Sequence, residues 1–266
     1  LYDLALSNVL KLKTIQKLVI DEVDVMLDLG FRFQLMNIFD LLPEKKQNIL
    51  FSATMTEDVG VLIDDFFKNP EKISIAVSGT PLENITQVSY NIPNFFTKVN
   101  LLHHLLKDKT TFNKVLIFVG YKRTADLLFK HLEPVFGNES CVIHSNKTQN
   151  YRIRSIKQFD AGFNRILLAT DVMARGLDFD NVSHVINFDT PDFPENYMHR
   201  IGRTGRAEKE GTAILLSTEK EQPFKIQIET LMDFNIPILE LPETVKISDV
   251  LTDDERPREE NEQSKN

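Results

Sequence analysis

Residues 114–132, KVLIFVGYKRTADLLFKHL, show the pattern that decides the fold class of this chain of 266 residues. Residues 114–119 form a short, largely apolar run, which is typical of a buried strand. Residues 122–132 follow almost directly and have the length and composition of a helix. The stretch therefore predicts a strand that leads into a helix.

The same alternation continues in both directions along the chain. Strands are also predicted at residues 17–20, 48–51, 72–77, 87–92, 140–144, 165–169, 183–188, 211–217 and 236–241, and helices at residues 31–42, 95–106, 148–159, 194–201 and 222–234. Thr56 is expected to cap a further helix that has Glu57 and Asp58 in its first turn. Strands that alternate with helices of about 10–15 residues predict parallel sheets with helices on both faces. Ligands of such sheets bind beyond the carboxyl ends of the strands.

The length of the chain and the linker-like sequence SGTPLE at residues 78–83 predict two α/β domains. We place the first domain at residues 1–77, the linker at residues 78–86 and the second domain at residues 87–245. Residues 246–266 are acidic and lack an apolar period, so they are predicted to form a disordered tail.

The composition excludes several classes of protein. Hydrophobic residues make up 42% and charged residues 26% of the chain, which rules out wholesale disorder. The longest apolar stretches, such as residues 115–119, fall far short of the roughly 20 residues that a membrane helix needs. The single cysteine, Cys141, cannot form an internal disulfide, and we expect it to be buried in a strand of a cytoplasmic protein.

The formal net charge of −8, taken alone, argues against a nucleic-acid partner. Its distribution changes this interpretation, because residues 1–83 carry 8 basic and 13 acidic side chains, whereas residues 84–248 carry 20 and 19. Residues 147–175 contain six basic and only two acidic side chains. A basic strip therefore lies inside a neutral second domain.

Acidic and hydroxyl side chains follow the first two predicted strands. In the sequence KLVIDEVD of residues 17–24, Asp21 could hold Mg²⁺, and Glu22 could orient or deprotonate an attacking water, as phosphoryl transfer requires. Acids after a strand also arise by chance, so this motif alone is weak. Ser52 and Thr54 could link the carboxylates to a neighbouring surface by hydrogen bonds, although turn and cap chemistry explains them better when they are taken alone.

Two further motifs lie in the second domain, ATDVMARGLD at residues 169–178 and HRIGRTGR at residues 199–206. Arg203 and Arg206 bracket a Thr-Gly pair, so one short loop could project two guanidinium groups. Such a pair can neutralise the charge that develops on a transferring phosphoryl group. A solvated basic loop is the alternative interpretation.

In this order, on two successive α/β units, the four motifs resemble those of the DEAD-box family of RNA helicases, in helicase superfamily two, and are most similar to its bacterial RhlE-like branch. The resemblance covers the chain from its start to about residue 245. It implies two RecA-like parallel-sheet domains, the first truncated at its N-terminus and the second complete, which close over ATP on one side and single-stranded RNA on the other. It also implies ATP hydrolysis coupled to unwinding or remodelling of RNA, and we expect a monomer.

The resemblance assigns roles to residues of both domains. In the first domain it implies a magnesium ligand, a water-activating carboxylate and three coupling residues, namely Asp21, Glu22, Asp24, Ser52 and Thr54. In the second domain the implied contacts to ribose, γ-phosphate and the domain interface come from Asp178, Arg203, Arg206, His199 and Arg200. The implied RNA contacts come from Gln149, Arg152, Thr170 and Gly176. Contacts to phosphate and sugar do not distinguish one base from another, so we expect RNA binding without sequence specificity.

The sequence departs from the family pattern in its glycines. A phosphate-cradling P-loop needs GxxxxGK followed by Ser or Thr, and none of the ten glycines is followed by Lys. We therefore expect the sequence to be the C-terminal portion of a helicase, inactive alone, whose P-loop precedes Leu1. The alternative function is an ATP-independent RNA-binding or interaction module, and a DNA helicase of the same superfamily is a third hypothesis.

Overall fold

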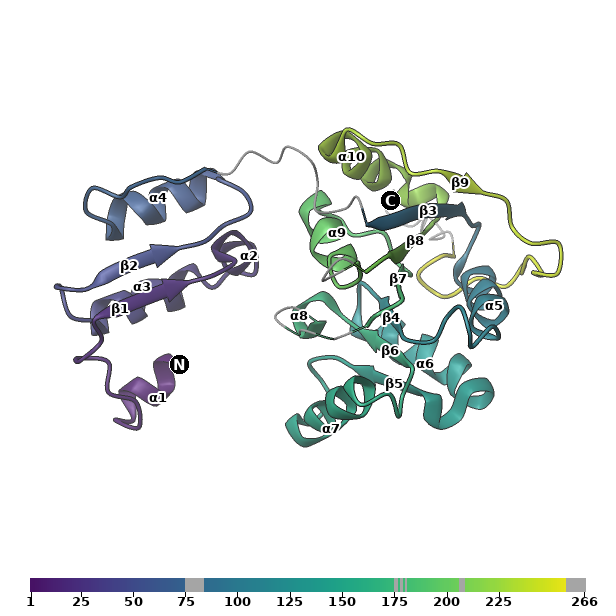
Figure 1. Ribbon diagram of the computed structural model, residues 1–266, viewed down its shortest axis with the longest axis horizontal. Helices are drawn as coiled ribbons and strands as arrows, with labels where there is room; N and C mark the ends of the chain where they lie inside the picture. Colours follow the sequence, from purple (N-terminus) through teal and green to yellow (C-terminus); the bar gives the residue numbers. More distant parts are fainter. Residues whose placement is uncertain (75–83, 175–176, 178, 180, 206–208, 257–266) are drawn as a thin grey trace, which may run out of the picture. The chain divides into compact units, whose positions relative to one another are not determined.

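The computed structural model describes residues 1–74, 84–174, 177, 179, 181–205 and 209–256 (Figure 1). The chain divides into two compact units, Leu1–Ala76 (unit 1) and Val77–Asn266 (unit 2). Most of the predicted linker lies outside the described residues. Within the described part of the chain, no helix combines the length and the apolar character that a membrane crossing requires.

Unit 1 is built on two parallel strands, β1 (Lys17–Ile20) and β2 (Gln47–Leu50). Its helices are α1 (Tyr2–Leu6), α2 (Val23–Asp28), α3 (Arg32–Leu41) and α4 (Glu57–Phe66). Buried apolar side chains of β1, α2, α3 and α4 form a cluster, which contains Ile20, Val23, Leu27, Leu35, Phe39, Val59 and Leu62. Thr56 caps α4 as predicted, because its side chain accepts a hydrogen bond of 3.3 Å from the Val59 N–H.

The strand predicted at residues 72–77 is not observed where the structure can be described. Residues 72–74 have no regular secondary structure, and residues 75–77 lie outside the described residues. Ile73 is 85% exposed, so the apolar character that suggested a strand is not used for packing there.

Unit 2 contains a parallel sheet of seven strands in the order β5-β6-β4-β7-β8-β3-β9 (Figure 1). The strands are β3 (Ile85–Asn91), β4 (Val115–Phe118), β5 (Ser140–Ile143), β6 (Ile166–Ala169), β7 (His184–Asn187), β8 (Gly211–Ser217) and β9 (Ile238–Leu239). The helices are α5 (Phe95–Leu106), α6 (Lys122–Phe136), α7 (Gln149–Asp160), α8 (Asp171–Ala174), α9 (Pro194–Ile201) and α10 (Gln222–Met232), with short 3-10 turns at η1 (Gly137–Glu139) and η2 (Glu219–Glu221). The predicted parallel α/β fold is therefore confirmed.

Helices cover both faces of this sheet, as the alternation of strands and helices predicted. Successive residues of β4 point to opposite faces: Val115 and Ile117 pack in a cluster with side chains of α5 and α6. Leu116 and Phe118 pack in a second cluster with side chains of α7 and α8. All four residues of β4, β5, β6 and β7 are buried, which explains their nearly continuous apolar sequences.

The predicted disordered tail differs from the structure over residues 246–256. The Asn94 side-chain amide donates a hydrogen bond of 2.5 Å to the Ser248 carbonyl, and the Phe95 N–H donates one of 2.6 Å to Glu255 Oε1. The first N–H groups of a helix lack partners inside the helix, so the start of α5 gives this polar segment a place to bind. Residues 257–266 lie outside the described residues.

Candidate functional site

The carboxyl ends of β1 and β2 meet at one edge of unit 1, because the strands are parallel and Ile20 pairs with Leu50. Asp24 lies just beyond this edge, in the first turn of α2, and is 3% exposed. Its Oδ2 accepts hydrogen bonds from the Thr54 N–H, at 2.8 Å, and from the Thr54 hydroxyl, at 2.9 Å. The Ser52 hydroxyl donates to the Thr54 carbonyl at 2.6 Å. The three residues predicted to couple domains are therefore joined to one another within unit 1.

Asp21 and Glu22 follow β1 directly and form the turn into α2. Glu22 precedes α2 with φ 51° and ψ 45°, the left-handed conformation, which costs a residue with a side chain roughly 1–2 kcal/mol. Asp21 Oδ1 accepts a hydrogen bond of 2.9 Å from the Glu22 N–H, which helps to hold this turn. Asp21 is exposed and Glu22 is half-buried, so both carboxylates remain at the edge of the sheet.

The carboxylates at this edge of the sheet fit a magnesium ion that takes most of its ligands from water and from substrate phosphates. Among the described residues, no three His, Cys, Asp or Glu side chains gather closely enough to enclose a metal. Mg²⁺ commonly binds one or two protein carboxylates and completes its octahedral shell with water and substrate phosphates. The exposed Asp21 carboxylate suits that arrangement.

Arg200, which the family resemblance assigned to the interface between domains, is buried in unit 2, with an exposed fraction of 2%. Its Nε and Nη2 donate to the two carboxylate oxygens of Asp171, at 2.6 and 2.7 Å. Nη1 donates to Asn187 Oδ1 at 3.1 Å and to the Asp189 carbonyl at 2.8 Å. The guanidinium carbon also lies 5.3 Å from the centre of the Phe118 ring. Arg200 thus ties α9 to the carboxyl ends of β4, β6 and β7, because their polar acceptors converge there.

Arg203 lies one turn beyond Arg200 and is partly accessible. Its Nη1 donates a hydrogen bond of 2.7 Å to the Leu177 carbonyl, in the segment that follows α8. A small pocket beside it is lined by Phe118, Asp171, Ala174, His199, Arg200 and Arg203. Three other predicted site residues, Gly176, Asp178 and Arg206, lie outside the described residues. Unit 2 therefore places His199 and Arg203 side by side at one pocket.

Of the predicted RNA residues, the described ones lie at the same end of the sheet. Thr170 follows β6 directly, and its carbonyl accepts the Met173 N–H of α8 at 3.0 Å. Gln149 begins α7, and the Arg152 guanidinium donates to the Gln149 side-chain oxygen and, at 3.0 Å, to the Met173 sulfur. The structure thus brings the start of α7 next to α8, whose first residue follows Thr170.

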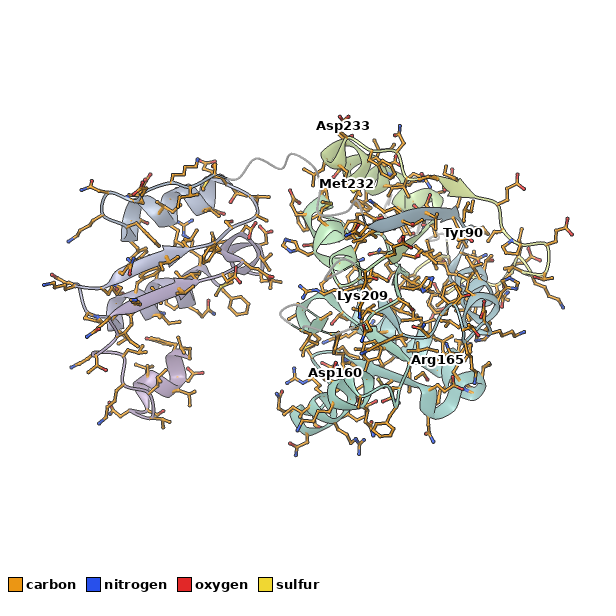
Figure 2. The ribbon with its side chains drawn as sticks, in the orientation of Figure 1. Tyr90, Asp160, Arg165, Lys209, Met232 and Asp233 are labelled. Carbon is orange, nitrogen blue, oxygen red and sulfur yellow. The ribbon has the colours of Figure 1, made fainter. Side chains whose placement is uncertain are left out.

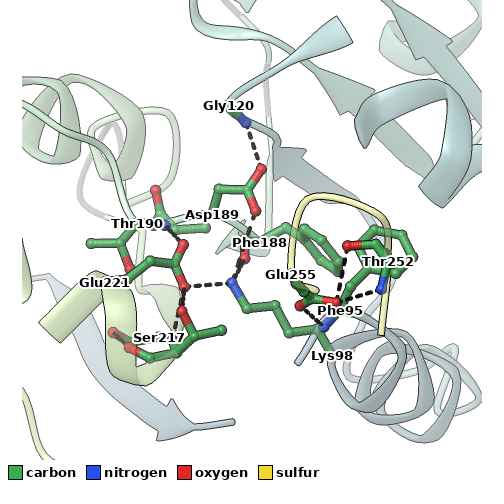
Figure 3. A network of polar contacts seen from close by, with 12 residues as sticks. Phe95, Lys98, Gly120, Phe188, Asp189, Thr190, Ser217, Glu221, Thr252 and Glu255 are labelled. Atoms are coloured by element: carbon green, nitrogen blue, oxygen red, sulfur yellow. Dashed lines mark hydrogen bonds and ion pairs between the residues drawn. The ribbon is translucent and has the colours of Figure 1, made fainter. Parts of the chain in front are cut away.

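A polar network around Asp189 was missed by the sequence reasoning (Figure 3). Asp189 Oδ2 accepts the Gly120 N–H at 2.8 Å, and Lys98 Nζ lies 3.8 Å from its Oδ1. Lys98 also donates to the Phe188 carbonyl at 2.6 Å and to Glu221 Oε2 at 2.8 Å. Burial raises the pKa of Asp189, and the Lys98 ammonium opposes this rise. The sequence did contain a signal for Asp189, because this acid directly follows the strand predicted at residues 183–188. The same pattern had selected Asp21 and Glu22 in unit 1.

Comparisons with known proteins show the family to which the chain belongs. The family model described as DEAD/DEAH box helicase matches residues 1–61, and the one described as helicase conserved C-terminal domain matches residues 97–208. The solved structure of the Escherichia coli DEAD-box protein SrmB, bound to regulator of ribonuclease activity A, is 32% identical, with a TM-score of 0.57, and the match covers 63% of this chain and 98% of that chain. The chain belongs to the DEAD-box helicase family.

Other DEAD-box relatives match more of the chain. The ATP-dependent RNA helicase RhpA of Helicobacter pylori is 41% identical over 84% of this chain and 45% of its own sequence. RhlB of Shewanella frigidimarina is 35% identical over 93% of this chain and 57% of its own. The structure of Saccharomyces cerevisiae Dbp5 bound to RNA and ADP BeF3 is 30% identical, with a TM-score of 0.81, over 90% of this chain and 63% of that chain. The chain thus spans about half the length of the curated relatives it matches.

Proposed function

We propose that the chain contributes to an ATP-dependent RNA helicase, which couples ATP hydrolysis to unwinding or remodelling of RNA. DEAD-box helicases bind RNA and ATP, and this chain belongs to their family. The observation that carries the proposal is the pair of hydrogen bonds between the buried Asp24 carboxylate and Thr54. These bonds fix the turn that leaves Asp21 and Glu22 at the edge of the sheet.

In this proposal, the carboxylates of unit 1 perform the hydrolytic chemistry. Asp21 holds Mg²⁺, which supplies positive charge to the phosphates when it is bound. Glu22 orients the attacking water and accepts its proton. The left-handed backbone conformation at Glu22 sets the direction in which its side chain leaves the main chain. Thr54, bonded to Asp24, links this turn to the Ser-Ala-Thr segment after β2.

Unit 2 supplies the cationic and RNA-binding groups in the same proposal. Arg203 and Arg206 stabilise the charge of the transferring phosphoryl group, and Asp178 binds the ribose of ATP. Gln149, Arg152, Thr170 and Gly176 contact the RNA backbone. Arg200 acts through Asp171, by holding α8 against the end of β6.

The experiment measures RNA-stimulated ATP hydrolysis in the whole protein that contains this chain. Arg203→Ala should lower kcat about 10³-fold or more, since this guanidinium neutralises charge only in the transition state. Glu22→Gln should lower kcat about 10²- to 10⁴-fold, because the amide cannot accept a proton. Glu44→Gln and Arg256→Ala, at exposed positions elsewhere, should leave kcat unchanged. Unchanged turnover in Arg203→Ala would reject the assignment of that residue.

A second candidate, an ATP-independent RNA-binding module, is favoured by the buried core of unit 2, to which the strands β3 to β8 and the helices α5, α6, α7, α9 and α10 all contribute. The two candidates differ in the effect of nucleotide on RNA binding. If the whole protein that contains this chain binds single-stranded RNA equally well with and without ADP and beryllium fluoride, the module is supported. An increase in affinity with the nucleotide supports the helicase.

A further inference from the structure

Helix α7 carries a row of exposed hydrogen-bond donors along its outer face. Asn150, Arg154 and Lys157 are separated by four and three residues, so they lie on one side of the helix, and all three are exposed. The only acid of α7 is Asp160, at its last position (labelled in Figure 2), and its carboxylate lies 3.7 Å from Lys114 Nζ. The row therefore presents an amide and two cations, and the nearest acid of the helix is already paired.

An exposed aromatic ring stands where this row ends. Phe163 is 77% exposed, more than any other aromatic side chain in the described part of the chain. It lines a shallow groove together with Ile153, Arg154, Lys157 and the start of the row at Asn150. Apolar surface gathered beside cations marks an interaction site more often than single exposed apolar residues do.

The backbone beneath Phe163 is fixed, so its exposure is built into the fold. The Phe163 N–H donates a hydrogen bond of 2.8 Å to the Gln158 carbonyl, and the Gly162 N–H donates one of 3.1 Å to the Phe159 carbonyl. Gly162 has φ +79°, which a residue with a side chain rarely adopts. The turn between α7 and β6 therefore holds the ring outward.

The row begins beside residues that the proposed function assigns to RNA. Gln149 and Arg152 occupy the first turn of α7, and Asn150 lies between them in the sequence. From there to the end of the helix the row extends over roughly 15 Å, at 1.5 Å per residue. Tyr151, also in the first turn, has Lys147 Nζ 5.9 Å and the Arg154 guanidinium 5.5 Å from its ring centre. Arg154 thus lies at both the Tyr151 ring and the groove that Phe163 lines, so it connects the start of α7 to that groove.

We propose that this surface, the α7 track, binds single-stranded RNA that continues past Gln149 and Arg152, with phosphates on Arg154 and Lys157 and a base stacked on Phe163. The proposal rests on RNA binding by this chain. Donors in a row, a flat ring and continuity with the predicted RNA residues fit a nucleic-acid strand better than a protein segment, because sequence-tolerant strand binding combines a basic groove with stacking platforms. The track should add affinity only for strands long enough to reach it.

The first test compares the binding of two RNA lengths by the 266-residue chain. We expect Arg154→Ala/Lys157→Ala to weaken binding of a strand of about 20 nucleotides at least tenfold and to leave a strand of about 6 nucleotides unaffected. The slope of log K against log salt for the long strand should become shallower by about 1.4, since each phosphate contact contributes about 0.7. Lys130→Ala/Lys220→Ala removes two exposed lysines outside α7 and should change neither quantity.

The outcomes separate this proposal from the proposed function. Unchanged long-strand affinity and salt slope in Arg154→Ala/Lys157→Ala would overturn the α7 track, and so would an equal loss for both lengths. Arg152→Ala should weaken both lengths, because that residue belongs to the shared path. If the unmodified chain bound neither strand, RNA binding itself would be rejected, and the track with it.

The second test locates the base on Phe163. Ultraviolet cross-linking of the long strand, followed by trypsin, should attach nucleotide to the peptide QFDAGFNR, residues 158–165, which carries Phe163. Phe159 in that peptide is fully buried, so the exposed ring is the expected site. Phe163→Ala should lose the adduct and bind the long strand about tenfold more weakly, while Phe163→Tyr should keep both. Full affinity of Phe163→Ala for the long strand would overturn the stacking contact.

Discussion

Asp24 of unit 1 and Asp171 of unit 2 both lie just after a parallel strand, but they are stabilised by different partners. Asp24 is 3% exposed and accepts hydrogen bonds from the neutral N–H and hydroxyl groups of Thr54. Asp171 receives two hydrogen bonds from the buried guanidinium of Arg200. The hydrogen bonds to Asp24 from Thr54 thus come from neutral groups, whereas those to Asp171 come from a cation.

The sheets at the two sites differ in burial. In unit 1, only one of the four residues of β1 is buried, and Val19 is 58% exposed. In unit 2, all the residues of β4, β6 and β7 are buried, and Arg200, at the carboxyl ends of these strands, is buried with them at an exposed fraction of 2%, whereas the side chain of its partner Asp171 is 22% exposed. A charge in such a place needs a charged partner, because unpaired burial costs several kcal/mol. Losing a polar partner should therefore cost unit 2 more than unit 1.

The largest effect is expected for Arg200→Met. This variant leaves Asp171 without its ion pair and should lower the free energy of unfolding of unit 2 by about 3–5 kcal/mol, measured by urea denaturation. The double variant Arg200→Met/Asp171→Leu removes both charges and should recover part of the loss. If the double variant were less stable than the single one, the ion pair would not be the source of the effect.

The second-largest effect is expected when the pH is lowered, which should destabilise unit 2 more than unit 1, because all six histidines lie in unit 2. Burial against Phe112, whose ring is stacked at 4.1 Å, lowers the pKa of His184 to about 4. The unfolded chain takes up this proton at about pH 6.5, so the stability that the neutral imidazole contributes is present above that pH and is lost as the pH falls toward 4. The loss amounts to about 3 kcal/mol.

The measurement is the urea midpoint of unit 2 from about pH 7 to pH 4. His184→Phe should flatten this dependence, since a phenyl ring keeps the stacking and takes up no proton. His104→Phe, in which the replaced ring is exposed on α5, serves as the control and should keep the dependence. An unchanged pH profile in His184→Phe would assign the acid sensitivity to other groups.

The smallest effect is expected for Thr54→Val in unit 1. Valine removes the hydroxyl donor but keeps the backbone N–H bond to Asp24, so unfolding of unit 1 should become easier by about 1–2 kcal/mol. Hydrogen exchange of the Thr54 and Val25 amides measures the change locally. Thr54→Ser should retain the stability, because it keeps the hydroxyl. A loss as large as that of Arg200→Met would contradict the comparison between the units.

Most of the elements could be predicted because their signals are local. Gly211–Ser217, Phe95–Leu106 and Pro194–Ile201 begin and end where the sequence placed them. The sequence missed α1, α2 and α8, which have five, six and four residues, because one or two helical turns contain too little periodicity to detect. It also ended α6 at Leu132, whereas the helix continues through Pro134 to Phe136, which is buried in the core.

The candidate site was predicted less completely than the fold. Asp21, Glu22 and Thr170 lie at strand ends, as the sequence indicated. The family resemblance assigned Arg200 to an interface between domains, and the structure adds contacts of its guanidinium that hold unit 2 together. Lys98 drew no attention, since a lone lysine in a helix usually faces solvent, yet it is 2% exposed and bonded to Glu221.

By itself, the sequence determined the alternation of strands and helices, the parallel sheet and the chemistry at the strand ends, because hydrophobic period and residue type are local properties. Only the tertiary structure decided which side chains meet. Thr54 reaches Asp24 across 30 residues and Arg200 reaches Asp171 across 29, because parallel strands distant in sequence end at a common edge. Strand order sets these partners, and no local pattern in the sequence encodes that order.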